Sequence, residues 1–248
     1  MGSFTVRALP GIPEIGPGDD LPAIVAAALA RERTPHGAIL ALAHTAVSKA
    51  EGAIVDLDAV SPGERAIELA REQDKDPRLV QVVLDESVEL LRAERGVLIA
   101  RTRHGFVCAN AGVDVSNAGR AERAILLPRD PDSSARAIRA ALGEDPPAVL
   151  VTDSFGRAWR HGQLDVAIGL AGLQPLDDWR GRTDSEGLEL RATWLAVADA
   201  VAAAADLARA KDSGEPAVLV EGLPHLVGAA DGPGARSLLR PRDEDLFL

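Results

Sequence analysis

The chain has 248 residues, 46% of them hydrophobic, which is enough for one large domain or two closely packed ones. Its net charge of −11 and its lack of a basic tract argue against nucleic acid or an anionic membrane as the main partner. The single cysteine, Cys108, excludes an intrachain disulfide and a cysteine-rich metal site. Because we find no signal peptide and no apolar run near 20 residues, we expect a cytoplasmic protein.

The first half of the chain mixes strand and helix patterns. Apolar alternation and short apolar runs predict strands over residues 4–9, 38–43 and 54–60. Helical spacing of apolar residues predicts helices over 21–31, 64–73 and 76–94. Gly96 is predicted to end the third helix.

The second half continues this mixture. We predict a hairpin formed by 97–101 and 105–107, and strands over 125–127 and 217–220. A helix capped at Asp132–Ser134 is predicted to stop at Gly143. The alanine-rich segment 192–210 predicts a helix with little polar surface, buried between layers or at a subunit interface.

The stretch 148–172 has the strongest chemical signal. Its apolar run 149–151 breaks into Thr152, Asp153 and Ser154, and a basic cluster follows. That cluster consists of Arg157, Arg160 and His161. A carboxylate, a hydroxyl and arginines after a buried strand are a common way to hold a cation and a phosphate. An ordinary turn or helix N-cap explains the Asp-Ser pair equally well, so both interpretations stay open on these residues alone.

Two further segments carry candidate ligand groups. Lys49 stands among small residues and can meet a phosphate as a point charge, although most lysines are simply solvated. The segment 108–119 is rich in small residues that allow close backbone approach, and it offers oxygen atoms on Asp114 and Asn117. A polar surface loop is the alternative for this segment.

Taken together, residues 45–52, 108–117 and 152–172 closely resemble signature segments of the coenzyme F420-0:L-glutamate ligase family. The resemblance extends through nearly the whole chain, including 75–80 and 241–247. It implies an α+β fold with mixed sheets and helices in two intertwined subdomains, and a homodimer. We therefore expect one ligase domain over 1–248, without the C-terminal flavin-binding domain that some members carry.

The resemblance also implies a reaction. GTP phosphorylates the terminal carboxylate of the deazaflavin precursor, coenzyme F420-0, and the amine of L-glutamate then displaces phosphate. Repetition extends a γ-linked polyglutamate tail. Two divalent cations, Mg²⁺ or Mn²⁺, are implied as cofactors. Whether K⁺ assists, and how many glutamates are added, stays open.

Site residues follow from the matched positions. Asp114 and Asp153 match metal-binding aspartates, and Ser154 matches a hydroxyl ligand of the second metal. The matched nucleotide-binding positions are Leu9, Pro10, Gly11, Ile12, His44, Lys49 and Asn117. Asp153 and Lys49 are the expected catalytic residues, and the basic cluster is inferred from its charge to hold substrate or phosphate.

Some positions depart from the family pattern or stay unassigned. His44 stands where many members have Ser or Thr, which leaves the choice of nucleotide open. For the remaining carboxylate ligand of the second metal, Asp212 and Glu215 are the candidates.

Two other functions use the same residues. A metal-dependent phosphohydrolase or nucleotidase would use the pair Asp114 and Asp153 without an amine substrate. A binding protein that had lost catalysis would keep only the fold, but the joint presence of Asp114, Asp153, Ser154 and Lys49 argues against it.

Overall fold

The computed structural model describes residues 2–115, 122–210 and 213–245. Two positions singled out in the sequence, Asn117 and Asp212, lie outside these ranges. The helices are α1 (Leu21–Leu29), α2 (His44–Ala50), α3 (Glu64–Gln73), α4 (Pro77–Asp85), α5 (Pro131–Ala141) and α6 (Val197–Ala208). The first strands are β1 (Thr5–Ala8), β2 (Ile39–Ala43), β3 (Ile54–Asp56), β4 (Ser87–Glu94), β5 (Val97–Thr102) and β6 (Val107–Ala109). The later strands are β7 (Arg123–Ile125), β8 (Ala148–Arg157), β9 (Arg160–Ala171), β10 (Asp177–Asp178), β11 (Trp194–Leu195) and β12 (Ala217–Glu221).

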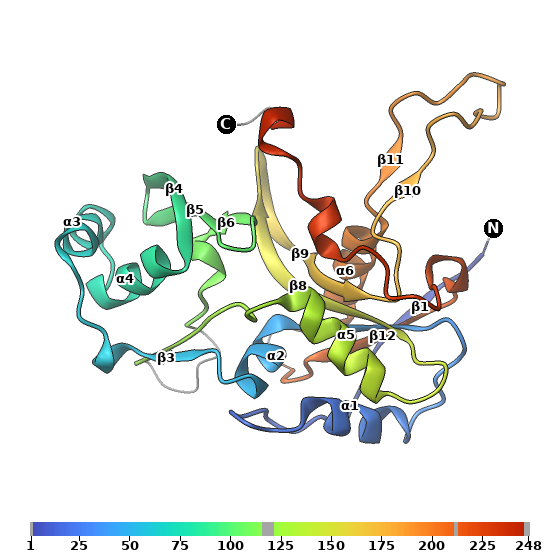
Figure 1. Ribbon diagram of the computed structural model, residues 1–248, viewed down its shortest axis with the longest axis horizontal. Coiled ribbons are helices and arrows are strands. Elements are labelled where there is room, and N and C mark those ends of the chain that lie inside the picture. Colours follow the sequence, from blue (N-terminus) through green and yellow to red (C-terminus); the bar gives the residue numbers. More distant parts are fainter. Residues whose placement is uncertain (1, 116–121, 211–212, 246–248) are drawn as a thin grey trace.

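A five-stranded sheet, called the main sheet below, organises the molecule (Figure 1). Its strand order is β1-β12-β2-β8-β9, and β2 and β8 run parallel while the other neighbours are antiparallel. The inner strands β2 and β12 consist of continuous apolar runs because both faces of the sheet are buried there. Helices α1, α2 and α5 cover one face, and α6 with the C-terminal segment covers the other.

The alanines of α6 explain how closely that helix approaches the sheet. Ala198, Ala202 and Ala205 are fully buried against Ala41, Leu150 and other residues of the inner strands. Small side chains let the helix approach the strands without a cavity. The prediction of a buried alanine-rich helix is confirmed, although the helix itself spans only Val197–Ala208.

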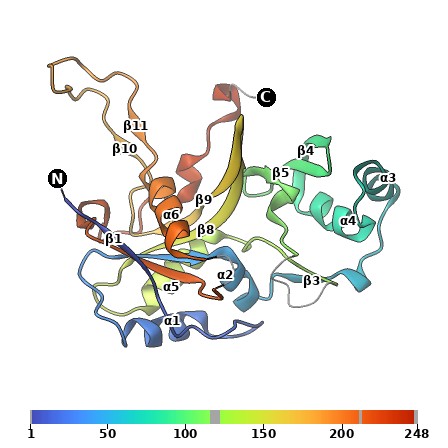
Figure 2. The same ribbon diagram turned by 180° about the vertical axis from the view of Figure 1, so that it is seen from behind.

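Residues 54–115 and 122–125, called the insert below, form a second part with its own core. The strands β4, β5 and β6 make a three-stranded antiparallel sheet, and α3 and α4 pack on it. The pair β3 and β7 connects the insert to the main sheet (Figure 2). Phe106 of the insert packs into the core beside the main sheet, edge-on to Phe155 of β8. The predicted α+β class with mixed sheets is confirmed, and the two cores come from interleaved parts of the sequence.

A long hairpin, called the arm below, spans residues 177–195 and extends away from the body of the molecule (Figures 1 and 2). It is held at its base by pairing of β10 with β11. Arg180 stacks over Trp194 at 4.1 Å from the ring centre, so the arm is stiffened by contacts within itself. Within the described part of the chain, no helix combines the length and the apolar character needed to cross a bilayer.

The predicted helix over 76–94 is wrong in its second half. Helix α4 ends at Asp85, and Ser87–Glu94 forms strand β4. Arg95 and Gly96 both have positive φ, 54° and 76°, and they form the two-residue turn between β4 and β5. Such turns match the twist of antiparallel strands, so the glycine marks a hairpin and not the end of a helix.

Two smaller expectations also need correction. The strand predicted over 54–60 ends at Asp56 and gives way to a 3-10 turn, Leu57–Ala59. The N-cap of α5 is Asp130, whose side chain accepts a hydrogen bond from the Ser133 amide. Asp132 is buried instead, and it accepts hydrogen bonds from the amides of Leu170 and Ala235.

Candidate functional site

A cavity of about 440 Å³ opens between the main sheet and the insert. It lies where the parallel strands β2 and β8 reach their carboxyl ends, the usual place for a ligand in a sheet with parallel strands. The lining comes from the segments after β1 and β2, from the β6 region of the insert, from the β8–β9 hairpin and from the segment before β12. Its polar side chains include Glu14, His44, Lys49, Asp114, Asp153, Ser154, Gln163, Asp165, Arg209 and Glu215.

The β8–β9 hairpin supplies the centre of this lining. The sequence predicted that the strand breaks at Thr152, but β8 continues through Asp153 and Ser154 to Arg157. The pairing shifts register between Val151 and Thr152, which places Ser154 directly opposite Asp165. Irregularities of this kind redirect side chains near active sites. Successive residues of a strand point to opposite faces, so Asp153 and Ser154 present their oxygens on different sides of β8.

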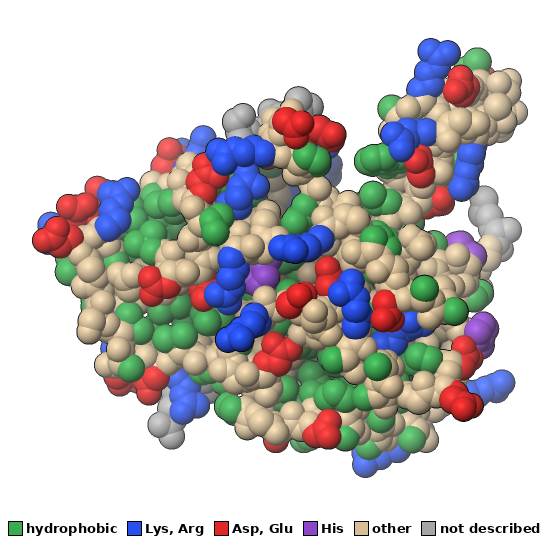
Figure 3. All heavy atoms as spheres, viewed as in Figure 1, with side chains coloured by type: hydrophobic (Ala, Val, Ile, Leu, Met, Phe, Trp, Pro, Cys, Tyr) green, Lys and Arg blue, Asp and Glu red, His purple; other side chains and the backbone are tan. Residues whose placement is uncertain are grey.

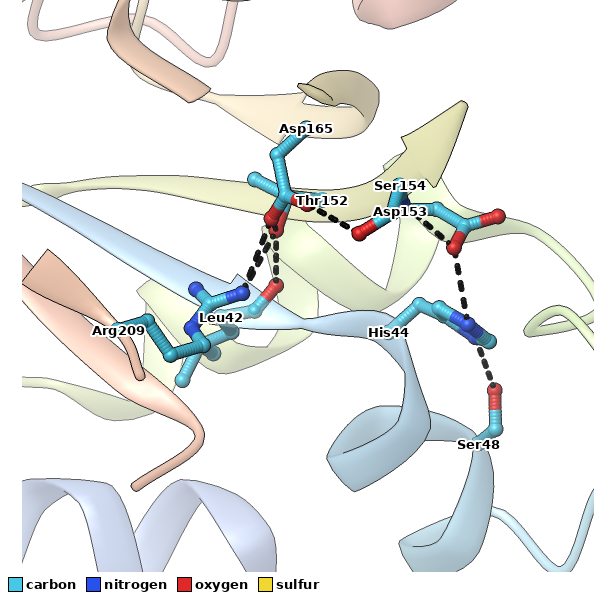
Figure 4. A network of polar contacts seen from close by, with 8 residues as sticks. All are labelled: Leu42, His44, Ser48, Thr152, Asp153, Ser154, Asp165 and Arg209. Atoms are coloured by element: carbon cyan, nitrogen blue, oxygen red, sulfur yellow. Dashed lines mark hydrogen bonds and ion pairs between the residues drawn. The ribbon is translucent and has the colours of Figure 1, made fainter. Parts of the chain in front are cut away.

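Asp153 points towards the start of α2. Its Oδ1 atom lies 3.3 Å from Nε2 of His44, whose ring is buried. The second ring nitrogen of His44 lies 3.4 Å from Oγ of Ser48, one turn along the helix (Figure 4). The register of the parallel strands β2 and β8 explains the contact between His44 and Asp153. Ala43 pairs with Thr152, and His44 and Asp153 are the next residues along the two segments.

On the other side of β8, a polar network surrounds Asp165 (Figure 4). Oγ of Ser154 donates to Oδ1 of Asp165 at 2.6 Å, and Oγ1 of Thr152 donates to Oδ2 at 2.7 Å. Arg209, just beyond α6, donates from Nη1 to the same Oδ2 atom at 3.0 Å. Asp165 is only 2% exposed, so this carboxylate is held by an ion pair inside the protein.

The insert contributes Asp114 from the end of a strained turn. Asn110, Ala111 and Gly112 have positive φ values of 50°, 54° and 72°. Residues other than glycine, such as Asn110 and Ala111, rarely adopt positive φ. Asp114 is then fixed by backbone hydrogen bonds in both directions with Ile125. This short bridge holds the Asp114 side chain at the cavity wall.

Cys108 also lines the cavity but does not offer a thiolate. Burial, with the nearby carboxylate of Asp153 adding to it, raises the pKa of the Cys108 thiol to about 12. Without a metal ion, the thiol therefore stays protonated at neutral pH. The other metal-ligating groups of the lining are the ring of His44 and oxygen atoms.

Lys49 reaches the cavity from α2. Its Nζ donates to Oε1 of Glu14 at 2.6 Å, and its side chain is 15% exposed. The predicted nucleotide corner, residues 9–12, lies beside the cavity, but the lining residues of this segment are its neighbours Pro13, Glu14 and Ile15. Leu9 itself is fully buried in the core.

The basic cluster is placed elsewhere. Arg157, Arg160 and His161 are exposed at the tip of the β8–β9 hairpin, where Nη2 of Arg157 donates to the carbonyl of His161 at 2.6 Å. None of the three belongs to the lining of the cavity as described. Of the two carboxylates considered for the second metal, Glu215 lines the cavity, and Asp212 lies outside the described residues.

The lining suits a divalent cation in its chemistry. Within the described ranges, the carboxylates of the lining belong to Glu14, Asp114, Asp153, Asp165 and Glu215, whereas Lys49 and Arg209 are its lysine and arginine. Hard oxygen donors in excess over cationic groups are what Mg²⁺ and Mn²⁺ prefer. Among the residues that the structure describes, no three His, Cys, Asp or Glu side chains already converge as a metal cluster. A cation held by Asp114 and Asp153, and a second one held by Ser154, would thus also need oxygens from a ligand or from water.

Sequence reasoning missed Asp165 and Arg209. A usable signal was present, because Asp165 is the one charged residue in the apolar run 164–171, and a carboxylate is seldom buried unless it is paired. Its partner could not be found in the same way, since Arg209 lies 44 positions further along the chain.

The mixed fold, with an acidic cavity at the carboxyl ends of a parallel strand pair, is typical of an α+β domain that binds a polar ligand. Comparison with known proteins makes this specific. The family model of F420-0:Gamma-glutamyl ligase matches residues 11–222, and the chain belongs to this family.

Characterised relatives agree along nearly the whole chain. The coenzyme F420:L-glutamate ligase of Methanothermobacter thermautotrophicus is 43% identical over 244 residues, covering 96% of each chain. The coenzyme F420:L-glutamate ligase of Methanopyrus kandleri is 41% identical and covers 100% of both chains. The protein of the same name from Halobacterium salinarum is 43% identical over 94% of this chain and 96% of its own.

Proposed function

We propose that this protein is a GTP-dependent ligase that joins L-glutamate to coenzyme F420-0. The observation that carries the proposal is the meeting of Lys49, Asp114, Asp153 and Ser154 in one cavity of a chain that belongs to this family. These residues come from both parts of the molecule, and folding alone brings them together.

The reaction has two steps. An oxygen of the F420-0 carboxylate attacks the γ-phosphorus of GTP, and the bond to the β-phosphate oxygen breaks, giving an acyl phosphate and GDP. The amine of L-glutamate then attacks the acyl carbon, phosphate leaves, and the amine loses a proton to give the amide. Repetition of both steps, with the γ-carboxylate of the newly added glutamate phosphorylated by another GTP, would build a polyglutamate tail.

The residues of the cavity have distinct roles in this scheme. Lys49 binds a phosphate oxygen of the nucleotide, and its present partner, the exposed Glu14, is easily displaced because an exposed ion pair is weak. Asp114 and Asp153 would hold one divalent cation, and Ser154 on the other side of β8 would contribute to a second. Mg²⁺ or Mn²⁺ would neutralise the charge that develops on the phosphate oxygens.

His44 supports Asp153 from its own place in the cavity wall. Its buried ring lies against Oδ1, so the carboxylate has a fixed orientation before any ligand enters. This contact gives the histidine a role that does not require it to touch the nucleotide.

Mass spectrometry of the deazaflavin product is the direct test. Purified protein would be incubated with F420-0, L-glutamate, GTP and Mn²⁺, with one reaction lacking glutamate. We expect mass gains of one or more glutamyl units only when glutamate is present. GTP consumption without any gain in mass would instead favour the phosphohydrolase, and neither change would favour a binding protein or another nucleotide.

Asp153→Ala provides the matched negative control for that experiment. Loss of a cation ligand removes several kcal/mol of transition-state stabilisation, so we expect product formation to fall by about 10³-fold. Asp145→Ala removes an exposed carboxylate far from the lining and should keep full activity. Equal activity of both variants would contradict the assignment of Asp153.

We also propose a homodimer in which the arm contacts a second copy of the chain. The arm carries exposed apolar side chains, with Leu188 65% and Trp194 50% exposed. On the face seen in Figure 3, green apolar atoms are visible on the arm among acidic and basic side chains. Apolar groups on a projecting hairpin are typical of a segment that is buried by a partner.

A further inference from the structure

We propose that Asp165, neutralised by Arg209, is a positioning residue that orients the Ser154 hydroxyl towards the cavity as a cation ligand. The inference rests on the proposed function, because it assigns a supporting residue to the cation site suggested there. Neither residue was expected from the sequence to take part.

The geometry across the hairpin supports this role. Ser154 and Asp165 are direct partners in the β8–β9 register, and the hydroxyl donates to Oδ1 at 2.6 Å. A serine hydroxyl has one proton to donate and two lone pairs with which to accept. Once the proton is directed at Asp165, the oxygen can meet a cation only through its lone pairs. The hydrogen bond therefore fixes the hydroxyl in the form that a metal ion needs.

The charge of the network is also suited to this role. An ionised carboxylate only accepts hydrogen bonds. Asp165 therefore does not donate a proton to the Ser154 oxygen, and the lone pairs of that oxygen stay available for a cation. Arg209 lies 3.0 Å from Oδ2 and compensates the buried negative charge. Thr152 donates to the same oxygen at 2.7 Å and also accepts from Nη1 of Arg209 at 3.2 Å. The orienting carboxylate is thus itself held from two sides.

A purely structural role does not account for this arrangement. Nε and Nη2 of Arg209 are buried and have no hydrogen-bond partner within the described ranges, and each such group costs about 1–3 kcal/mol. Apolar residues in place of a buried ion pair are often as stable or more stable. The neighbouring positions of α6 are alanines and valines packed on the sheet, so an apolar solution was available to this fold.

Binding of Mn²⁺ in the presence of GDP, followed by the electron paramagnetic resonance of the free ion, tests the inference without using activity. Residues that orient a metal ligand typically contribute 10–100-fold to affinity, so we expect Asp165→Asn to weaken Mn²⁺ binding by about that factor. Ser154→Ala should weaken it as well. The double variant Ser154→Ala/Asp165→Asn should bind Mn²⁺ as tightly as Ser154→Ala alone, because Asp165 acts through the Ser154 hydroxyl.

Two further variants separate positioning from folding. Asp132→Asn changes another buried carboxylate, one that also bonds to β9 but does not line the cavity, and it should leave Mn²⁺ affinity unchanged. Asp165→Leu combined with Arg209→Met removes both charges, so that no unpaired charge stays buried. We expect this protein to fold, as judged by circular dichroism, and still to bind Mn²⁺ about 10–100-fold more weakly than the wild type.

The outcomes are distinguishable. If wild-type protein does not bind Mn²⁺, the proposed cation site itself is wrong, and this inference fails with it. If wild-type protein binds Mn²⁺ and the Asp165 variants bind equally well, only the positioning role is overturned. Additive losses of Mn²⁺ affinity in Ser154→Ala/Asp165→Asn would also overturn the positioning role, since Asp165 would then act independently of Ser154.

Discussion

Lys49 reaches the cavity on a short helix, where it pairs with the exposed Glu14. Replacement by alanine removes a positive charge from the cavity. We therefore expect Lys49→Ala to raise the KM for GTP by about 10–100-fold, since a hydrogen bond to a charged group contributes about 1.5–3 kcal/mol. Because the Lys49 side chain is only 15% exposed, some packing is lost as well, and we expect the unfolding free energy to fall by about 1 kcal/mol or less.

Steady-state kinetics and urea denaturation of the same preparations check this. Glu14→Ala is the matched control, because it removes the other member of the ion pair and should leave the KM unchanged or lower it. A loss of stability in Lys49→Ala equal to its loss of affinity would indicate a structural lysine instead.

His104 makes the stability of the insert sensitive to pH. Its Nε2 donates to the carbonyls of Pro128 and Arg129, and its Nδ1 is buried with no partner among the described residues. Burial, aided by the charge of Arg103, holds the pKa of His104 below its ordinary value of 6.5. Below about pH 6.5 the unfolded chain takes up a proton that the folded chain does not, so the unfolding free energy falls as the pH decreases towards the lowered pKa.

The variant His104→Gln isolates this contribution. A glutamine amide can still donate to a carbonyl but does not titrate, so we expect a shallower loss of stability between about pH 7.5 and pH 5.5. Urea denaturation at several pH values measures the two slopes, and the other histidines contribute equally to both proteins. Identical slopes would show that His104 is not the sensitive group.

At the scale of elements, one buried arginine joins α5 to the segment after β12. Arg139 donates to the carbonyls of Gly228 and Ala229 and pairs with Asp231 at 2.8 Å. Gly172, with φ of 77°, makes room for it, because a Cβ there would lie 2.5 Å from the guanidinium carbon. This contact fastens the C-terminal segment over the end of β9.

We expect Arg139→Met to lower the unfolding free energy by about 2 kcal/mol, since it removes two hydrogen bonds to carbonyls and the ion pair with Asp231. Asp231→Asn removes only the partly exposed partner and should cost less than about 1 kcal/mol. Equilibrium urea denaturation compares the two. Equal and small losses would mean that the C-terminal segment is held by its apolar contacts alone.

The elements that the sequence predicted well share a physical feature. Strands β2 and β12 are short apolar runs between turn residues, and α1 has helical spacing behind the capping residue Asp20. The errors arose where the same residues fit both the helical and the strand periodicity. In 87–94 the apolar residues Leu90, Leu91 and Ala93 suit either a helix or a strand, and pairing with β5 decided the outcome.

The candidate site divides in the same way. Asp114, Asp153, Ser154 and Lys49 were found because each lies in a motif, and the structure brings them to one cavity. The prediction that Arg157, Arg160 and His161 hold substrate or phosphate rested on their charge and stays a prediction. Because β8 and β9 extend as a long hairpin, those side chains lie at its tip and outside the lining of the cavity.

At the scale of the whole molecule, local sequence patterns could not predict how the two cores are interleaved along the chain. Residues 54–115 and 122–125 pack mainly among themselves, while the segments before and after them share the main sheet. Such pairing depends on contacts between distant residues, as in β12 beside β2, and no single window of sequence contains both partners. Resemblance to a family supplied what the periodicity could not.

The last prediction concerns assembly. If the arm is buried by a second copy, a charge on its apolar surface should separate the copies. We expect the wild-type protein to have about twice the chain mass of 25.9 kDa by light scattering, and Leu188→Asp to shift it towards a single chain at micromolar concentration. Val88→Asp is the matched control, because Val88 on the insert is also 65% exposed and should leave the dimer intact. A single-chain mass for the wild type, or a dimer that tolerates Leu188→Asp as well as Val88→Asp, would contradict the role of the arm.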